Sequence, residues 1–348
     1  MTTICTKKAG SPHGLRPWSV ALALVMLALI TVLPRAAPAA DPGPLVLEST
    51  IPLPDVRGRI DHLAVDRGRQ RLIVAALGND TVEVVDLMTG KRSQRLRDLS
   101  EPQGVGYADK ADLLVVANAG DGSVRFFGAA DLARLGRIEL RKDADNIRID
   151  PRNGTIVVGY GDGSLAIIAP TTRAPIGTIP LRAHPEGFQI DPTTGRAFVN
   201  VLEAGQIAIV DLDARRQIAS WKVPGADDNF PMALDAATAT LATVFRSPPR
   251  LVLLDTKTGT VTASLPTCGN ADDVFVDAKR ARIYVSCGAG QIGVFQRDGG
   301  TYRPLASIPT ASGTRTSLFV PELDRLFVAV RAGLLDSAAS IQIYRPTP

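Results

Sequence analysis

The sequence has few of the residues and motifs that identify an activity. Of its 348 residues, three are cysteine, three are histidine and two are tryptophan. It contains no Gly-x-Ser-x-Gly elbow, no glycine-rich phosphate loop followed by lysine, and no His-x-x-x-His pair. These absences exclude an elbow-type serine hydrolase, a phosphate-loop nucleotide hydrolase and a helical two-histidine zinc site.

The chain also lacks an excess of charge once its first 40 residues are set aside. That segment holds four basic residues and no acidic one, which leaves 35 basic and 35 acidic residues in the remainder. The formal net charge of +4 therefore belongs to the N-terminal segment. A neutral remainder without a basic cluster or an aromatic stacking platform gives no footprint for nucleic acid, so we expect no nucleic-acid partner.

The N-terminal segment resembles a secretory signal. Lys7, Lys8 and Arg16 precede an uncharged apolar run from Trp18 to Leu33, and Ala37-Pro38-Ala39 supplies the small residues of a cleavage site. The alternative is a retained membrane anchor, but a run of 16 residues is short against the roughly 20 that span a bilayer. We therefore expect residues 1–40 to be cleaved. Residues 41–348 would then form a single periplasmic or secreted domain without a stable membrane span.

That remainder consists of seven sequence repeats of about 42 residues. In each unit an apolar stretch ends at an aligned position, occupied in turn by Asp66, Ala108, Asp150, Asp191, Asp235, Asp277 and Pro321. The residues one and three places earlier are apolar in all seven units, which predicts a strand with two different faces. The next two stretches of a unit are nearly continuous apolar runs, as expected for strands covered on both sides. Four short strands per unit predict an all-β fold, a seven-bladed β-propeller of four-stranded antiparallel blades.

The two ends of the chain complement each other. Six units have a fourth strand, whereas the seventh stops at Pro348 after its third. Leu45–Leu53 (LVLESTIPL) resembles the fourth strand at Ile176–Leu181 and precedes the first unit. We predict that this segment joins the last blade, so that the closed ring has no open sheet edge.

The second strands of several units share a short pattern. Arg325–Val330 (RLFVAV), Arg282–Ser286 (RIYVS) and Arg196–Asn200 (RAFVN) resemble the Tyr-Val-Thr-Asn (YVTN) type of repeat, within the WD40-like superfamily. His184–Gly187 followed by Ile190-Asp191-Pro192 also matches the way that family begins a blade. The resemblance covers essentially all of residues 41–348 and implies an exported bacterial seven-bladed propeller. Trp-Asp repeats fit less well, because the one tryptophan outside the N-terminal segment, Trp221, precedes lysine.

The loops that lead into the blades contain the candidate site, because they gather at one mouth of the central channel. Five places before the aligned positions stand Asp61, Gln103, Asp145, Glu186, Phe230, Asp272 and Thr316. With their neighbours, these give the candidate binding residues Asp61, His62, Asp145, His184, Glu186, Asp272, Asp273 and Arg315. The carboxylates and histidines can hold a divalent cation or act as acid and base. Alternatively the acids are structural and accept backbone N–H groups. The sequence assigns no catalytic residue and identifies no cofactor.

Two cysteines lie outside the N-terminal segment. Cys268 precedes the first strand of the sixth unit, and Cys287 ends its second strand. Because those strands are predicted to be antiparallel neighbours, both sulfurs fall at the same end of one blade. In an exported chain this predicts a disulfide.

Fold alone does not assign a function, because propellers have many unrelated ones. The leading hypothesis is a monomeric binding or scaffold module that takes a protein or small-molecule ligand at the channel mouth. The alternative is a lactonase-like hydrolase or lyase that uses a metal or a His–carboxylate pair. A third hypothesis is an accessory subunit of a periplasmic redox enzyme.

Overall fold

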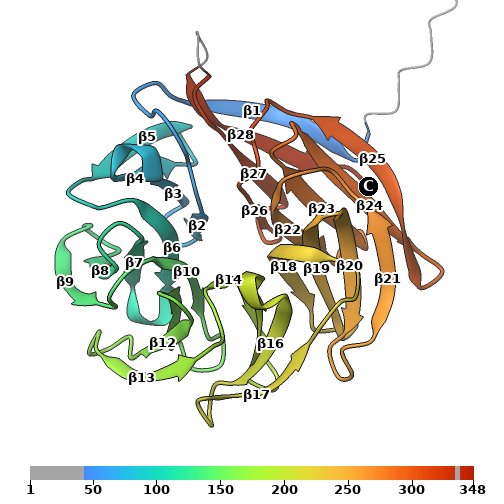
Figure 1. Cartoon of the computed structure of the whole chain (residues 1–348). Coiled ribbons are helices and arrows are strands. Elements are labelled where there is room, and N and C mark those ends of the chain that lie inside the picture. Colours follow the sequence, from blue (N-terminus) through green and yellow to red (C-terminus); the bar gives the residue numbers. More distant parts are fainter. Residues whose placement is uncertain (1–42, 334–337) are drawn as a thin grey trace, which may run out of the picture. The chain divides into compact units, whose positions relative to one another are not determined.

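The computed structural model describes residues 43–333 and 338–348, and Pro42–Pro348 forms one compact unit. The predicted signal segment, residues 1–40, lies outside the described residues. Seven four-stranded antiparallel sheets form a ring (Figure 1). Each innermost strand contacts the innermost strand of the next sheet, and the seventh contacts the first. The predicted all-β seven-bladed propeller is confirmed.

Within a blade the strands follow one another from the ring centre outward. Blades 1 to 3 consist of β2 (Leu63–Asp66), β3 (Arg71–Ala76), β4 (Thr81–Asp86), β5 (Lys91–Leu96), β6 (Pro102–Ala108), β7 (Leu113–Asn118), β8 (Ser123–Gly128), β9 (Arg134–Glu139), β10 (Ala144–Ile149), β11 (Ile156–Tyr160), β12 (Ser164–Ile168) and β13 (Pro175–Pro180). Blades 4 to 6 consist of β14 (Pro185–Ile190), β15 (Arg196–Val201), β16 (Gln206–Asp211), β17 (Arg216–Trp221), β18 (Asp227–Asp235), β19 (Thr240–Ser247), β20 (Pro249–Asp255), β21 (Val261–Pro266), β22 (Ala271–Asp277), β23 (Arg282–Cys287), β24 (Gln291–Asp298) and β25 (Thr301–Pro309). The short 3-10 helices η1 (Leu77–Asn79), η2 (Asp109–Ala111) and η3 (Leu202–Ala204) follow second or first strands of their blades.

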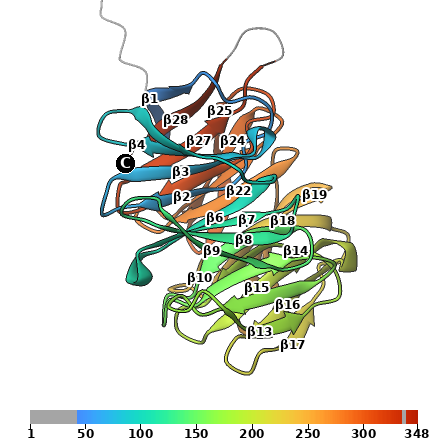
Figure 2. The same ribbon diagram turned by 90° about the vertical axis from the view of Figure 1, so that its left-hand side faces the viewer.

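The seventh blade joins both ends of the chain, as predicted. It consists of β26 (Ser317–Val320), β27 (Arg325–Val330), β28 (Ala339–Pro346) and, outermost, β1 (Leu45–Leu53). The blue strand β1 lies beside the red strand β28 in Figures 1 and 2. Ile51 pairs with Ile341 and Leu53 with Ala339, and all four side chains belong to one buried cluster. Apolar burial therefore fixes the register of this closure.

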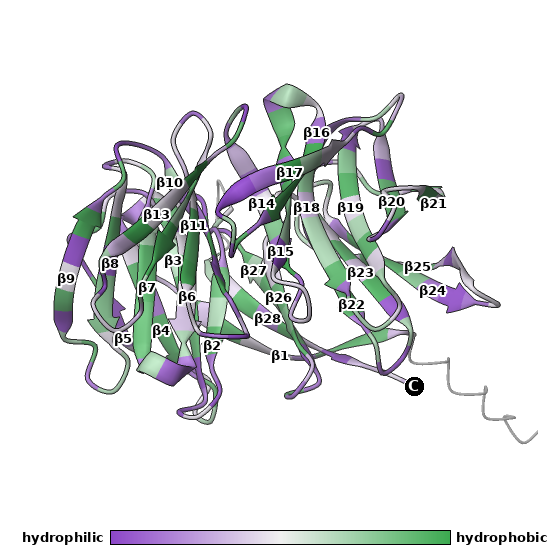
Figure 3. Ribbon diagram, turned by 90° about the horizontal axis from the view of Figure 1, so that it is seen from below, coloured by the Kyte–Doolittle hydropathy of each residue, from purple (hydrophilic) through white to green (hydrophobic). Residues whose placement is uncertain are grey.

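Burial along the strands follows the sequence pattern. The middle strands β7 and β23 are buried along their whole length, whereas β9 is almost entirely exposed. Figure 3 shows hydrophobic green along β7, whereas the outer strand β9 alternates between hydrophilic purple and green. The apolar clusters lie between blades: Val157 of blade 3 packs in one cluster with Phe188 and Val199 of blade 4. The core therefore holds adjacent blades together.

The aligned aspartates terminate the first strands at the ring end opposite the cavity described below. Asp191 Oδ1 accepts the backbone N–H of Thr193 (2.8 Å), and Asp66 Oδ1 accepts that of Arg69 (3.0 Å). Such side-chain caps explain why aspartate recurs at this turn.

Cys268 and Cys287 form the predicted disulfide, with Cα atoms 5.9 Å apart. Cys287 is fully buried at the end of β23. No helix in the described part of the chain is both long enough and apolar enough to span a membrane.

Candidate functional site

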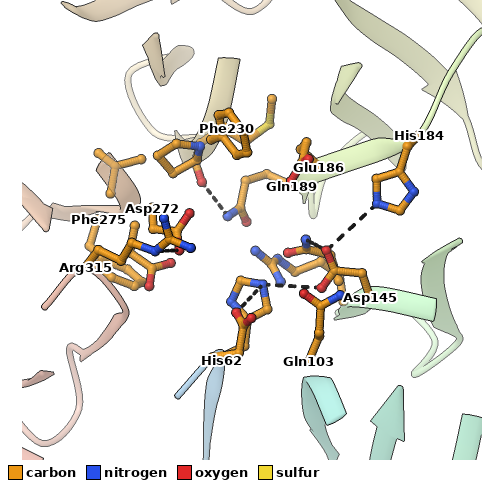
Figure 4. A pocket seen from close by; sticks show the side chains of 18 of the residues that line it. His62, Gln103, Asp145, His184, Glu186, Gln189, Phe230, Asp272, Phe275 and Arg315 are labelled. Atoms are coloured by element: carbon orange, nitrogen blue, oxygen red, sulfur yellow. Dashed lines mark hydrogen bonds and ion pairs between the residues drawn. The ribbon is translucent and has the colours of Figure 1, made fainter. Parts of the chain in front are cut away.

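All eight residues singled out from the sequence line one cavity, which we call the axial cavity. It has a volume of about 290 Å³ and is lined by residues of the inner strands or of the loops that lead into them (Figure 4). The side chains in Figure 4 come from separate blades and face a common space. The predicted convergence of these loop residues on one place is therefore present in the structure.

Irregular strand pairing builds this lining. In five of the seven blades the register between first and second strand shifts at the start of the first strand. The residues at the shifts include Gln103, Asp145, Glu186, Phe230 and Asp272, all of which line the axial cavity. A bulge leaves an extra residue unpaired and turns its side chain away from the regular alternation. The sequence placed these residues in loops, and the structure places them in bulges within the strands.

Gly104 allows two bulged strands to approach each other. A Cβ atom on Gly104 would lie 1.9 Å from the backbone oxygen of Asp145 in the next blade. Any side chain there would force β6 and β10 apart. The glycine therefore positions Asp145 at the cavity.

His62 and His184 both approach the carboxylate of Asp145. His62 Nε2 lies 3.7 Å from Asp145 Oδ1 and 3.8 Å from Asp61 Oδ1. His184 Nε2 lies 3.9 Å from Asp145 Oδ2, and its Nδ1 donates to the backbone oxygen of Gly161 at 2.7 Å. That bond fixes the orientation of the ring and points Nε2 at the cavity.

These contacts move pKa values in opposite directions. Burial alone would lower the pKa of His62, but the negative charges of Asp61 and Asp145 outweigh it and raise that pKa. Burial likewise opposes the charged form of His184, yet Asp145 and the Gly161 carbonyl raise its pKa to about 9. Burial raises the pKa of Asp61 to about 6, against the attraction of His62 and Arg59. For Asp145, the two imidazoles outweigh burial and lower the pKa.

Asp272 is paired with two arginines on the opposite side of the cavity. Arg315 Nε lies 2.8 Å from Asp272 Oδ2, and Arg246 forms an ion pair with Oδ1. The Arg246 guanidinium carbon lies 3.3 Å from the centre of the Phe230 ring, a cation–π contact. The charge of Asp272 is thus neutralised by the protein.

Glu186 and Asp273 are different, because no cation pairs with them. Glu186 forms no hydrogen bond or ion pair with any residue that the structure describes. Burial, with the nearby charge of Asp145, raises the pKa of Glu186 to about 7. Asp273 accepts the backbone N–H of Ser317 at 2.7 Å, and burial raises its pKa to about 7. Asp273 matches the structural interpretation of the acids, whereas Glu186 does not.

Two further acceptors in the lining are buried and accept no hydrogen bond from the described residues, although one of them, Asp145 Oδ1, faces His62. Asp145 is 7% exposed and Asn146 is 2% exposed. Their Oδ1 atoms have no hydrogen-bond partner within residues 43–333 and 338–348. Buried polar atoms without partners are uncommon in folded proteins and call for an explanation, such as a bound ligand.

The described residues offer no metal site and no hydroxyl or thiol nucleophile here. No group of three or more His, Cys, Asp or Glu residues among them is arranged to hold a metal ion. Arginines already neutralise Asp61 and Asp272, which weakens their attraction for a cation. The described lining of the axial cavity also contains no Ser, Thr, Cys, Tyr or Lys.

Several lining residues were not singled out from the sequence. Arg148, Gln189 and Phe275 stand two places before the aligned position, where the inner strands face the channel. The sequence indicated these residues only weakly, because the residue two places before the aligned position is small, polar or aromatic in different units. Arg246 lies on the second strand β19, and only the packing of blade 5 against blade 6 brings it to Asp272.

Comparisons with known proteins establish the fold and no family. No family model matches the chain, and no curated protein matches it. A chain in the structure titled "Kuenenia stuttgartiensis Hydrazine Synthase" is similar at a TM-score of 0.72 and 16% identity, covering 82% of this chain and 97% of that one. A chain in "Crystal Structure of Mitotic Checkpoint Complex" is similar at a TM-score of 0.73 and 13% identity, covering 94% of this chain and 100% of that one. The YVTN resemblance stays a prediction.

Proposed function

We propose that this chain is an exported propeller that binds a small polar ligand in the axial cavity. The observation that carries the proposal is a set of acceptors at one place that accept no hydrogen bond from the described residues: the Glu186 carboxylate, Asp145 Oδ1 and Asn146 Oδ1. A concave space with a few convergent polar groups is typical of a ligand site. A propeller fold is compatible with this role as a binding module.

The unused groups indicate the chemistry of the ligand. All three are acceptors once Glu186 is ionised, so the ligand presents donors to them, as an amine or several hydroxyl groups do. Phe230, Met232 and Phe275 add an apolar part to the lining. A volume of about 290 Å³ suits a metabolite-sized molecule better than a folded partner.

A retention assay with a mixture of small molecules tests this proposal, because it does not require the ligand to be known beforehand. Purified protein is dialysed against a small-molecule cell extract, and retained compounds are identified by mass spectrometry. We expect at least one polar compound to be retained by the wild type and lost from Glu186→Gln. The matched control is Glu139→Gln on the outer strand β9, which should retain it. Identical retention by all three proteins would refute the proposal.

A second candidate function is acid–base catalysis, favoured by the pKa of Glu186 near 7, which suits a general base at neutral pH. A lactonase-like hydrolase would then use Glu186 to activate water. The test is hydrolysis of dihydrocoumarin, which should rise with pH through about 7 and vanish in Glu186→Gln. Hydrolysis no faster than in buffer alone would eliminate this candidate.

The similarity to a chain of hydrazine synthase does not support the accessory-subunit hypothesis, because at 16% identity the similarity concerns the fold alone.

A further inference from the structure

A second cavity, which we call the arginine cavity, adjoins the axial cavity. It has a volume of about 310 Å³ and shares Arg59 and Arg315 with the axial cavity. Its third charged residue is Arg331, which follows β27. No Asp or Glu is among the described residues that line it. Two adjoining spaces thus have opposite character, since acidic side chains are prominent in one and arginines supply all the charge of the other.

The three arginines keep N–H groups available for a ligand. Arg59 uses Nη2 for Asp61 at 2.6 Å and for Gln103 Oε1 at 3.4 Å. Arg315 uses Nε for Asp272 and Nη1 for Asn270. The Arg331 side chain forms no hydrogen bond or ion pair with any residue in the described ranges. Free guanidinium nitrogens on three arginines provide the donor pattern that oxyanions require.

Gly313 packs against the side chain of Arg331. Its φ is +80°, and a Cβ atom there would lie 2.3 Å from Nε and from Nη2 of Arg331. The guanidinium therefore lies against the glycine backbone. A glycine is required both by the backbone angle and by this contact. The arrangement holds an unpaired arginine at the edge of the cavity.

We propose that the arginine cavity binds an oxyanion of the same ligand whose donor group lies in the axial cavity. This inference rests on the proposed function and narrows its ligand class. The ligand is an amine or polyol that carries a carboxylate or a phosphoryl group. Arg59 and Arg315, which line both cavities, contact it at the junction.

Binding of simple oxyanions tests the arginine cavity by itself. Inorganic phosphate and acetate are titrated at constant ionic strength and followed by ligand-observed NMR, which shows whether the site prefers a phosphoryl or a carboxylate group. Loss of one guanidinium in Arg331→Gln should weaken binding about tenfold. Arg331→Lys keeps the positive charge but loses the paired N–H donors of the guanidinium group. Its affinity for the anions should therefore lie between those of the wild type and Arg331→Gln.

Arg97→Gln is the matched control, because Arg97 is an exposed arginine outside both cavities. It should bind the anions like the wild type. Equal binding by wild type and Arg331→Gln, or equal weakening in Arg97→Gln, would overturn the inference. Retention that depends on Glu186, without anion binding that depends on Arg331, would refute the arginine cavity alone.

Discussion

His62 Nε2 lies 3.7 Å from Asp145 Oδ1, which joins the first and third blades across the channel mouth. His184 of the region before the fourth blade approaches the other oxygen of the same carboxylate. One buried carboxylate thus stabilises two imidazolium ions, and they lower its pKa in return.

Asp145→Asn should lower the pKa of both histidines. That of His184 should fall from about 9 toward the ordinary value near 6.5. These are the only two histidines in residues 41–348, so an NMR titration of a protein that begins at residue 41 shows just two imidazoles. Unchanged titration of both rings would contradict the assigned network.

Glu186→Gln should change the pH dependence of stability. The pKa of Glu186 is raised from 4.5 to about 7, so the folded state holds a proton that the unfolded state releases between these values. The wild type therefore loses stability as pH rises from about 4.5 through 7. The variant should match it at pH 4 and be more stable at pH 8 by about 3 kcal/mol, since one pKa unit corresponds to about 1.4 kcal/mol. Urea denaturation at pH 4 and pH 8 measures the free energy of unfolding of both proteins. A difference between variant and wild type that is the same at both pH values would contradict the raised pKa of Glu186.

Gly104→Ala should destabilise the ring at the cavity. The added Cβ would meet the Asp145 carbonyl oxygen, and such overpacking costs about 1–3 kcal/mol. Gly269→Ala is the control, since nothing lies within 4 Å of its added Cβ. Similar melting temperatures for the two variants would show that the close approach of β6 and β10 is unimportant.

The closure by β1 should contribute strongly to stability. Leu53 is fully buried in the cluster shared with β28, and its replacement by alanine should cost about 2–5 kcal/mol. Leu47→Ala on the same strand removes a side chain that is 47% exposed and should cost far less. Deletion of Leu45–Leu53 should lower the melting temperature further still. Equal, small effects of both substitutions would contradict closure by this strand.

The disulfide should stabilise blade 6. Its loop spans 19 residues, for which chain entropy gives about 3 kcal/mol. Cys268→Ala/Cys287→Ala should unfold at correspondingly lower urea concentration. Two free thiols found by mass spectrometry of the oxidised wild type would contradict the bond.

The fold could be predicted from the sequence because its determinants repeat. Apolar residues one and three places before each aligned position recur in seven units, and at least one member of each pair packs in an apolar cluster between blades. The missing fourth strand of the last unit likewise pointed to Leu45–Leu53. The cysteine pair was predictable because strand order alone makes them neighbours.

The site was predictable only in outline. The repeat spacing identified the residues five places before the aligned positions. The alternation of apolar residues begins only after them, so it does not predict that these residues lie in β-bulges. The ion pair of Arg246 with Asp272 depends on packing between blades, which no local pattern encodes. Nor does the sequence distinguish Glu186, which has no partner among the described residues, from Asp272, which has two.

The most direct test of ligand binding in the axial cavity is a crystal structure of the wild-type protein with the compound that it retains. We predict density in the axial cavity, with a donor group within hydrogen-bond distance of Glu186 and of Asp145 Oδ1. A ligand bound on any other face of the ring, with the axial cavity holding only water, would contradict the account.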